Sequence, residues 1–226
     1  MDTKKVLGVA LLIGGVGVAG AVIYYSTKKS RSPLLGRGMP PESVETEDGY
    51  KLTHHRQAEM PIKDRIAILQ DLTAKSVRDP RMRKIALQMT RHCKERDASC
   101  EAKGIYSWMK RNVRYTGDIG PHALWSGGPV EGVDLFQSAY RTVEFGGGDC
   151  DDHAILACTA ALLNGMSCKY RVTSPRRGKQ DDFTHIYAMI GLPKMRPTKY
   201  VAVDTTLPGQ RYGVEAPHAK KLDFVA

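Results

Sequence analysis

Residues 146–165, which read GGGDCDDHAILACTAALLNG, decide the fold. Asp149 suits a helix N-cap, and the acids that follow it lie where the helix dipole favours negative charge. All residues of the range 154–163 but one are apolar, so the predicted helix has no polar face and should be buried. Asn164-Gly165 supplies a left-handed stop. We therefore predict a central helix with Cys150 in its first turn.

Three helices are predicted before this segment, because apolar residues recur there at helical spacing. The first has an apolar face from Ile62 to Leu72, and the second begins at Asp79-Pro80, an N-cap followed by a proline. The third has its apolar face between Ile105 and Val113. Residues 117–147 are rich in glycine and proline, and so long a connection suggests a functional loop.

Three runs with strand-like composition follow the central helix, at 167–174, 183–191 and 199–207. Helices come first and strands last, an order typical of the α+β class. The predicted fold therefore has N-terminal helices and a buried helix packed on an antiparallel sheet.

The N-terminal part has a different character. Residues 6–25 contain no charge, and as a helix they would rise about 30 Å, enough to cross a bilayer. We predict a transmembrane anchor at 1–29, a linker at 30–60 and a catalytic domain at 61–226. The localisation predicted is a single-pass protein of a bacterial inner membrane or a phage-associated membrane.

The alternative to an anchor is a cleaved signal peptide, with Ala19-Gly20-Ala21 as its cleavage site, which would give a secreted or periplasmic protein. The apolar run continues past this site and then meets basic residues, as a stop-transfer segment does. The basic residues on the two sides, Lys4 and Lys5 before the run against four after it, would place the C-terminal domain in the cytoplasm.

Charge and cysteine content exclude several classes of protein. The net charge is +10, and residues 1–38 contribute half of it, with six cations against one anion. These cations flank the apolar run, so a lipid membrane explains them better than nucleic acid. The five cysteines are an odd number without a CxxC pair, which argues against zinc and against a disulfide framework, although Cys93 and Cys100 could pair. No cofactor or metal is implied.

Cys150 is the candidate nucleophile. A helix N-terminus favours a thiolate and can bind a developing oxyanion. The neighbouring acids would raise the pKa of the thiol if they pointed at the sulfur, and a nearby imidazolium would have to outweigh them. Acids that cap their own backbone would do less harm. His153 is expected to be solvated or to act as a cap.

His185 and Asp204 are the candidate base and its orienting group. If 183–191 and 199–207 form a hairpin closed across 191–198, paired residue numbers sum to 389, so His185 and Asp204 face each other. A carboxylate beside an imidazole fixes its tautomer and favours its charged form. Asp204 could instead only cap a turn.

Four stretches together resemble the transglutaminase-like superfamily of papain-like thiol enzymes: IYSWMKRNVRYTGD, GGGDCDDHAILACTAALLNGMSCKYRV, FTHIYAMIG and YVAVDTTLPG. The resemblance covers roughly residues 80–210 and is closest to small single-domain bacterial and phage types. It implies that Cys150 is the nucleophile, His185 the base and Asp204 its orienting group. Gln137 and Trp125 are candidates for the oxyanion site.

The function predicted is that of a membrane-anchored cysteine peptidase or amidase that forms an acyl-thioester on a protein or peptide substrate. Transfer of the acyl group to an amine, as in a transglutaminase, and an acetyltransferase with the same triad are related possibilities. The alternative from another class is a catalytically silent structural or assembly protein of a membrane or a membrane-containing virion.

Overall fold

The computed structural model describes residues 42–45, 51–56, 61–116, 133–175 and 183–226, all within one unit, Pro40–Ala226. Its elements, in chain order, are β1 (Glu42–Glu45), β2 (Lys51–Arg56), α1 (Ile62–Arg78), α2 (Pro80–Thr90), α3 (Ala98–Asn112), β3 (Arg114–Tyr115), β4 (Val133–Phe136), α5 (Ala139–Phe145), β5 (Gly147–Gly148), α6 (Cys150–Leu163), β6 (Cys168–Ser174), β7 (His185–Leu192), β8 (Lys199–Val203) and β9 (Lys220–Val225).

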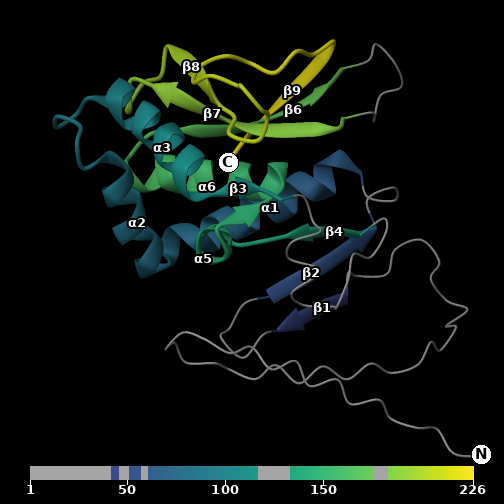
Figure 1. Ribbon diagram of the computed structural model, residues 1–226. Coiled ribbons are helices and arrows are strands. Elements are labelled where there is room, and N and C mark those ends of the chain that lie inside the picture. The colour runs from purple at the N-terminus through teal and green to yellow at the C-terminus, as the bar shows by residue number, and fades with distance from the viewer. Residues whose placement is uncertain (1–41, 46–50, 57–60, 117–132, 176–182) are drawn as a thin grey trace, which may run out of the picture. The chain divides into compact units, whose positions relative to one another are not determined.

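Helix α6 lies at the centre of the described part. It contacts α1, α2, α3 and α5 as well as strands β6 and β7. The main sheet is antiparallel in the order β8-β7-β6-β9, and the helices lie along one of its faces (Figure 1). This mixed architecture with an antiparallel sheet confirms the predicted class. The helices predicted to begin near Ile62 and at Pro80, and the one at Cys150, are all present.

The strand β7 is apolar on both faces. Ile186 and Ile190 belong to the main core, which also contains α6, whereas Tyr187 and Met189 join Ala216 in a small second cluster on the other face. The side chains alternate because successive residues of a strand point to opposite faces. The segment after β8 therefore covers what would otherwise be an exposed apolar face of the sheet.

Four elements fall where the sequence indicated connections. Strands β1 and β2 lie within 30–60, the expected linker, and pair with β4 in an antiparallel sheet. Strand β4 and helix α5 lie within 117–147. The sequences ESVE and KLTHHR carry too few apolar residues for a period of two to be recognised. Their pairing depends on contacts distant in sequence, which a local pattern does not record.

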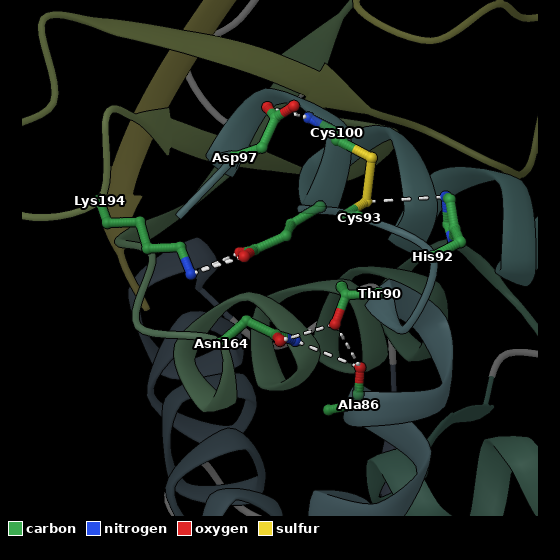
Figure 2. Close-up of a disulfide and its surroundings, with 9 residues drawn as sticks. Ala86, Thr90, His92, Cys93, Asp97, Cys100, Asn164 and Lys194 are labelled. Atoms are coloured by element: carbon green, nitrogen blue, oxygen red, sulfur yellow. Dashed lines mark hydrogen bonds and ion pairs between the residues drawn. A yellow bond between two sulfur atoms is a disulfide. The ribbon is translucent and has the colours of Figure 1, made fainter. Parts of the chain in front are cut away.

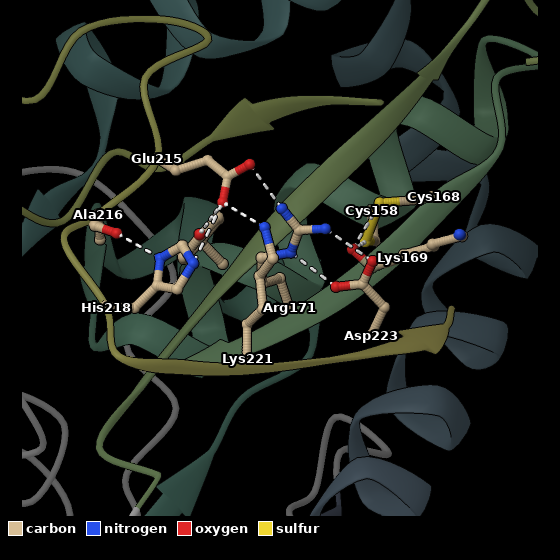
Figure 3. Close-up of polar contacts among 10 residues, drawn as sticks. Cys158, Cys168, Lys169, Arg171, Glu215, Ala216, His218, Lys221 and Asp223 are labelled. Carbon is tan, nitrogen blue, oxygen red and sulfur yellow. Dashed lines mark hydrogen bonds and ion pairs between the residues drawn. A yellow bond between two sulfur atoms is a disulfide. The ribbon is translucent and has the colours of Figure 1, made fainter. Parts of the chain in front are cut away.

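Two disulfides correct the expectation that a disulfide framework is absent. Cys93 and Cys100, whose pairing was left open, link the segment after α2 to the first turn of α3 (Figure 2). Cys158 and Cys168 link α6 to β6 (Figure 3). Cys158 is buried, as expected, but in a covalent bond rather than in simple packing. An odd number of cysteines leaves one thiol, and here it is Cys150.

A cluster of ion pairs holds β9 against the sheet. The Arg171 guanidinium on β6 donates to both carboxylate oxygens of Asp223 on β9, at 2.6 and 2.7 Å, and pairs with Glu215 at 2.7 Å (Figure 3). The Arg171 side chain is only 10% exposed, so its charge needs these partners. Local sequence patterns do not predict this cluster, because its members lie far apart in the chain.

The predicted membrane segment, residues 6–25, and its alternative cleavage site lie outside the described residues. Within the described ranges, none of the helices combines the length and apolar character needed to cross a bilayer.

Candidate active site

Cys150 is the first residue of α6, as predicted. Asp149 is the N-cap, and Asp152 completes a capping box. The Asp149 side chain accepts from the backbone N–H of Asp152, and the Asp152 side chain accepts from the backbone N–H of Asp149. Gly148 is required here, since a Cβ at this position would approach the Cβ of Asp152 to 2.6 Å. The local sequence thus fixes the start of the helix and the position of the thiol.

Two of the three acids around Cys150, Asp149 and Asp152, direct carboxylate oxygens at N–H groups. Asp149 accepts from the backbone N–H groups of Asp151 and Asp152, at 3.1 and 3.4 Å. Asp152 accepts from the backbone and the side-chain amide of Gln137, at 2.7 and 2.5 Å. These donors offset part of the negative charge of Asp149 and Asp152 near the sulfur.

His185 is the first residue of β7, and Asp204 follows the last residue of β8. The His185 Nε2 and the Asp204 Oδ2 are 2.8 Å apart. The predicted register was wrong, since Ala188 pairs with Val203 and paired numbers sum to 391. A shift of two residues keeps side chains on the same face, so the two groups still meet, diagonally and beyond the end of β8.

Asp204 is buried and carries two roles at once. Burial alone raises the pKa of its carboxyl, but hydrogen bonds from His185 and Thr206 outweigh burial and leave this pKa below its usual value. The Thr206 backbone N–H and hydroxyl donate to Oδ1 at 3.0 and 2.7 Å. The carboxylate therefore caps a turn with one oxygen and holds an imidazole with the other.

Cys150 and His185 line the same cleft, of about 60 Å³, together with Asp149, Asp151 and Thr184. Side chains from α1, β4, β6 and β7 and the side chain of Phe183 complete its walls. The structure thus brings the thiol and the imidazole predicted from the sequence to one cleft, with Asp204 behind the imidazole.

His153 was expected to be solvated or to act as a cap, and this was wrong. It is 3% exposed, with Nδ1 at 2.6 Å from the Thr205 hydroxyl and Nε2 at 3.3 Å from the Arg114 carbonyl oxygen. Because a carbonyl only accepts, we place the ring proton on Nε2, so that Nδ1 accepts from Thr205. Burial lowers the pKa of His153 and keeps the ring neutral. The absence of a polar face on α6 could have indicated this burial.

The two oxyanion candidates have different outcomes. Gln137 is buried and donates to Asp152, so it braces the start of α6, and it is not among the described residues that line the cleft. Trp125 lies outside the described residues. At the start of α6, the backbone N–H groups of Asp149, Asp151 and Asp152 donate within the cap, so what the helix offers the thiol is the positive end of its dipole.

Two groups of side chains in the described residues have the spacing of metal ligands. Asp149, Asp151 and Asp152 form the first group, but this acidic cluster is the N-terminal cap of α6. The second group includes Cys93 and Cys100, which are joined in a disulfide and so cannot act as thiolate ligands.

Comparison with known proteins gives a family. The family model described as the transglutaminase-like superfamily matches residues 83–205, more than half of the chain. No curated protein matches the sequence.

Solved structures give distant matches. A candidate protease from Parabacteroides distasonis has 13% identity and a TM-score of 0.39, over 61% of this chain and 30% of that one. A candidate cysteine protease from Cytophaga hutchinsonii has 15% identity and a TM-score of 0.39, over 83% and 71%. A protein described as a TGase has 17% identity and a TM-score of 0.34, over 70% and 37%. The chain thus spans less than a third of the first of these proteins.

Proposed function

We propose that this chain, which belongs to the transglutaminase-like superfamily, is a thiol hydrolase that cleaves an amide or peptide bond with Cys150, His185 and Asp204. The observation that carries the proposal is the 2.8 Å bond between the imidazole of His185 and the buried carboxylate of Asp204, at the edge of the cleft that Cys150 lines. A nucleophile, a base and a group that orients the base are the parts that acyl transfer needs.

The bond between His185 and Asp204 supports one assignment of the proton. Since Nε2 of His185 donates to Asp204, Nδ1 is the nitrogen that takes the proton of the Cys150 thiol. The thiolate attacks the carbonyl carbon of the substrate, and the carbonyl oxygen becomes an oxyanion that the positive end of the α6 dipole favours. When the C–N bond breaks, the leaving amine takes the proton from Nδ1.

Water completes the reaction. His185 removes a proton from a water molecule, the hydroxide attacks the thioester carbon, and the C–S bond breaks. The sulfur leaves as a thiolate, and the products are a carboxylic acid and the amine released earlier. An amine in place of water would give a transamidase by the same steps, with a new amide as the product.

Alkylation by iodoacetamide tests the proposal. Four of the five cysteines are in disulfides, so in non-reducing buffer the reagent has one target, Cys150. We expect Cys150 to react at least about tenfold faster than N-acetylcysteine at pH 7, since a tenfold gain corresponds to one pKa unit of thiolate stabilisation. His185→Ala should remove this advantage.

His218→Ala is the matched control. The His218 side chain is 20% exposed, close to the 17% of His185, but it pairs with Glu215 on the other side of the sheet from α6. This variant should react like the unchanged protein. A rate equal to that of N-acetylcysteine, unaffected by His185→Ala, would instead support a silent structural or assembly protein.

We also propose that residues 6–25 anchor the protein in a membrane. The support is the uncharged run of twenty residues with basic residues on both sides. The two disulfides favour a domain outside the cytoplasm, because disulfides persist in oxidising compartments, which opposes the orientation that the flanking charges indicate. Membrane pelleting of the full chain, compared with a chain without residues 1–29, tests the anchor, and labelling of intact cells with an impermeant thiol reagent tests the side.

A further inference from the structure

The cleft beside Cys150 has walls of two kinds. The polar wall contains the thiol, the imidazole of His185 and the acids at the start of α6. The opposite wall comes from α1, from Phe136 of β4, from Phe183 and from the ends of β6 and β7, and it is apolar except for Arg65 of α1. The mechanism proposed above uses only the polar wall, so the apolar wall has no role in it.

The apolar wall follows from regular geometry. Ile62, Ile66 and Leu69 are spaced by four and three residues, so they lie on one face of α1. Val172 and Ile186 are direct cross-strand partners in β6 and β7, and they face the same side of the sheet. Helix α6 packs against both α1 and β7, and its first residue, the nucleophile, lines the cleft that these apolar side chains enclose.

The apolar wall is buried at its inner end and more exposed to solvent at its mouth. Leu69 and Val172 are only 1% and 2% exposed and continue into the main core. Ile62 and Phe183 are half-buried, so they present surface that a ligand can reach. An apolar group bound between them would lose contact with water without displacing any core residue.

The size of the cleft limits what fits. One water needs about 10–15 Å³ on this measure, so about 60 Å³ has room for four to six groups of that size. A branched aliphatic side chain with three or four carbons meets this limit. An indole does not.

We propose that this wall is a specificity subsite for an aliphatic side chain, valine, leucine or isoleucine, on the residue that carries the scissile carbonyl. The inference rests on the proposed function. The leaving amine must lie against His185 to take its proton, which leaves the α1 side of the cleft to the acyl part of the substrate. The substrate class is therefore a peptide or acyl amide with an aliphatic group next to the carbonyl.

Peptidyl vinyl sulfones test the inference, because the Cys150 thiolate adds to the β-carbon of the vinyl group while the α-carbon takes a proton. Three such compounds differ only in the residue next to the vinyl group, which is glycine, leucine or tryptophan. Rates of mass gain on the intact full chain give the preference. We expect leucine to react about tenfold or more faster than glycine, and faster than tryptophan, because one or two methylene groups in an apolar pocket change such ratios by about 10- to 200-fold.

A variant pair locates the subsite. Ile62→Ala enlarges the mouth and should shift the tryptophan-to-leucine ratio about tenfold towards tryptophan. Ile68→Ala is the matched control, since Ile68 is also half-buried on α1 and packs on the core but does not line the cleft. It should leave the ratio unchanged.

The failures are distinguishable. Fast reaction of Cys150 with iodoacetamide, combined with equal rates for the glycine and leucine compounds, overturns the subsite and leaves the proposed function standing. Equal effects of Ile62→Ala and Ile68→Ala on the ratio also overturn the subsite. Slow reaction with iodoacetamide overturns the proposed function and the subsite with it.

Discussion

Removing the disulfide between Cys158 and Cys168 is expected to destabilise the domain more than removing the one between Cys93 and Cys100. Both bonds close short loops, with sequence separations of 10 and 7. The loss of loop-closure entropy in the unfolded chain then gives about 2.7 kcal/mol for the first bond and about 2.4 kcal/mol for the second. Chain entropy alone therefore predicts nearly equal effects.

Burial separates the two disulfides. Cys158 and Cys168 are 0% and 2% exposed, whereas Cys93 and Cys100 are half-buried. Replacing each buried cysteine by alanine removes a buried atom, with a cost of about 0.8 kcal/mol each if sulfur counts as one methylene group. We therefore expect about 4 kcal/mol for C158A/C168A and about 2.4 kcal/mol for C93A/C100A.

Urea unfolding of the two double variants and of the unchanged protein, followed by circular dichroism, measures these losses. The free energies of unfolding in water are compared between proteins whose free energy falls with urea concentration at the same slope. A different slope would indicate a change in the unfolded state. Equal losses, or a larger loss for C93A/C100A, would refute the reasoning that burial of the bond between α6 and β6 adds to its effect.

Three further predictions concern single residues. Asp204→Asn should slow the iodoacetamide reaction about tenfold or more, because the amide no longer favours the imidazolium, and the labelling assay measures it. Burial lowers the pKa of His153, so as pH falls this imidazole binds a proton in the unfolded chain before it does so in the folded protein. The contribution of His153 to the free energy of unfolding is complete above pH about 6.5 and declines below it, by at most about 1.4 kcal/mol per pH unit. Between pH 7.5 and 5.5, the free energy of unfolding measured in urea should change less with pH for His153→Gln than for the unchanged protein. Parallel pH dependences of the two proteins would contradict this. Arg171→Met removes the buried cation that pairs with Asp223 and Glu215 and should cost about 3 kcal/mol by urea unfolding. Lys75→Met, which breaks an exposed pair, should cost under about 1 kcal/mol.

The parts of the fold that sequence could predict are those that local patterns determine. Helix α6 was predicted to within a residue, because a capping sequence, an uninterrupted apolar run and an Asn-Gly stop all agree. The pair of His185 and Asp204 was predicted although its register was wrong, since an error of two residues preserves the face of a strand. An error of one residue would have separated them.

The parts that sequence could not predict depend on contacts between distant segments. The bond between His153 and Thr205 spans 52 residues, and the one between Arg171 and Asp223 also spans 52. None of the segments that carry these residues has a periodic pattern that indicates its partner. The Cys158–Cys168 disulfide was missed for another reason: both residues suit an apolar core equally well as thiols, and an odd number of cysteines did not favour pairing.

The proposed nucleophile and its base come from different layers, so their distance depends on how α6 is held against the sheet. The Cys158–Cys168 disulfide joins the layers, but it lies eight residues, or about 12 Å, along the helix from Cys150. A link so far away does not by itself set the distance of the first turn from the sheet. His153 is within one turn of the sulfur, and its partner Thr205 adjoins Asp204, so a tilt of the helix would strain the residue that orients the base. The disulfide should therefore govern stability, and the histidine bond should govern the geometry of the thiol.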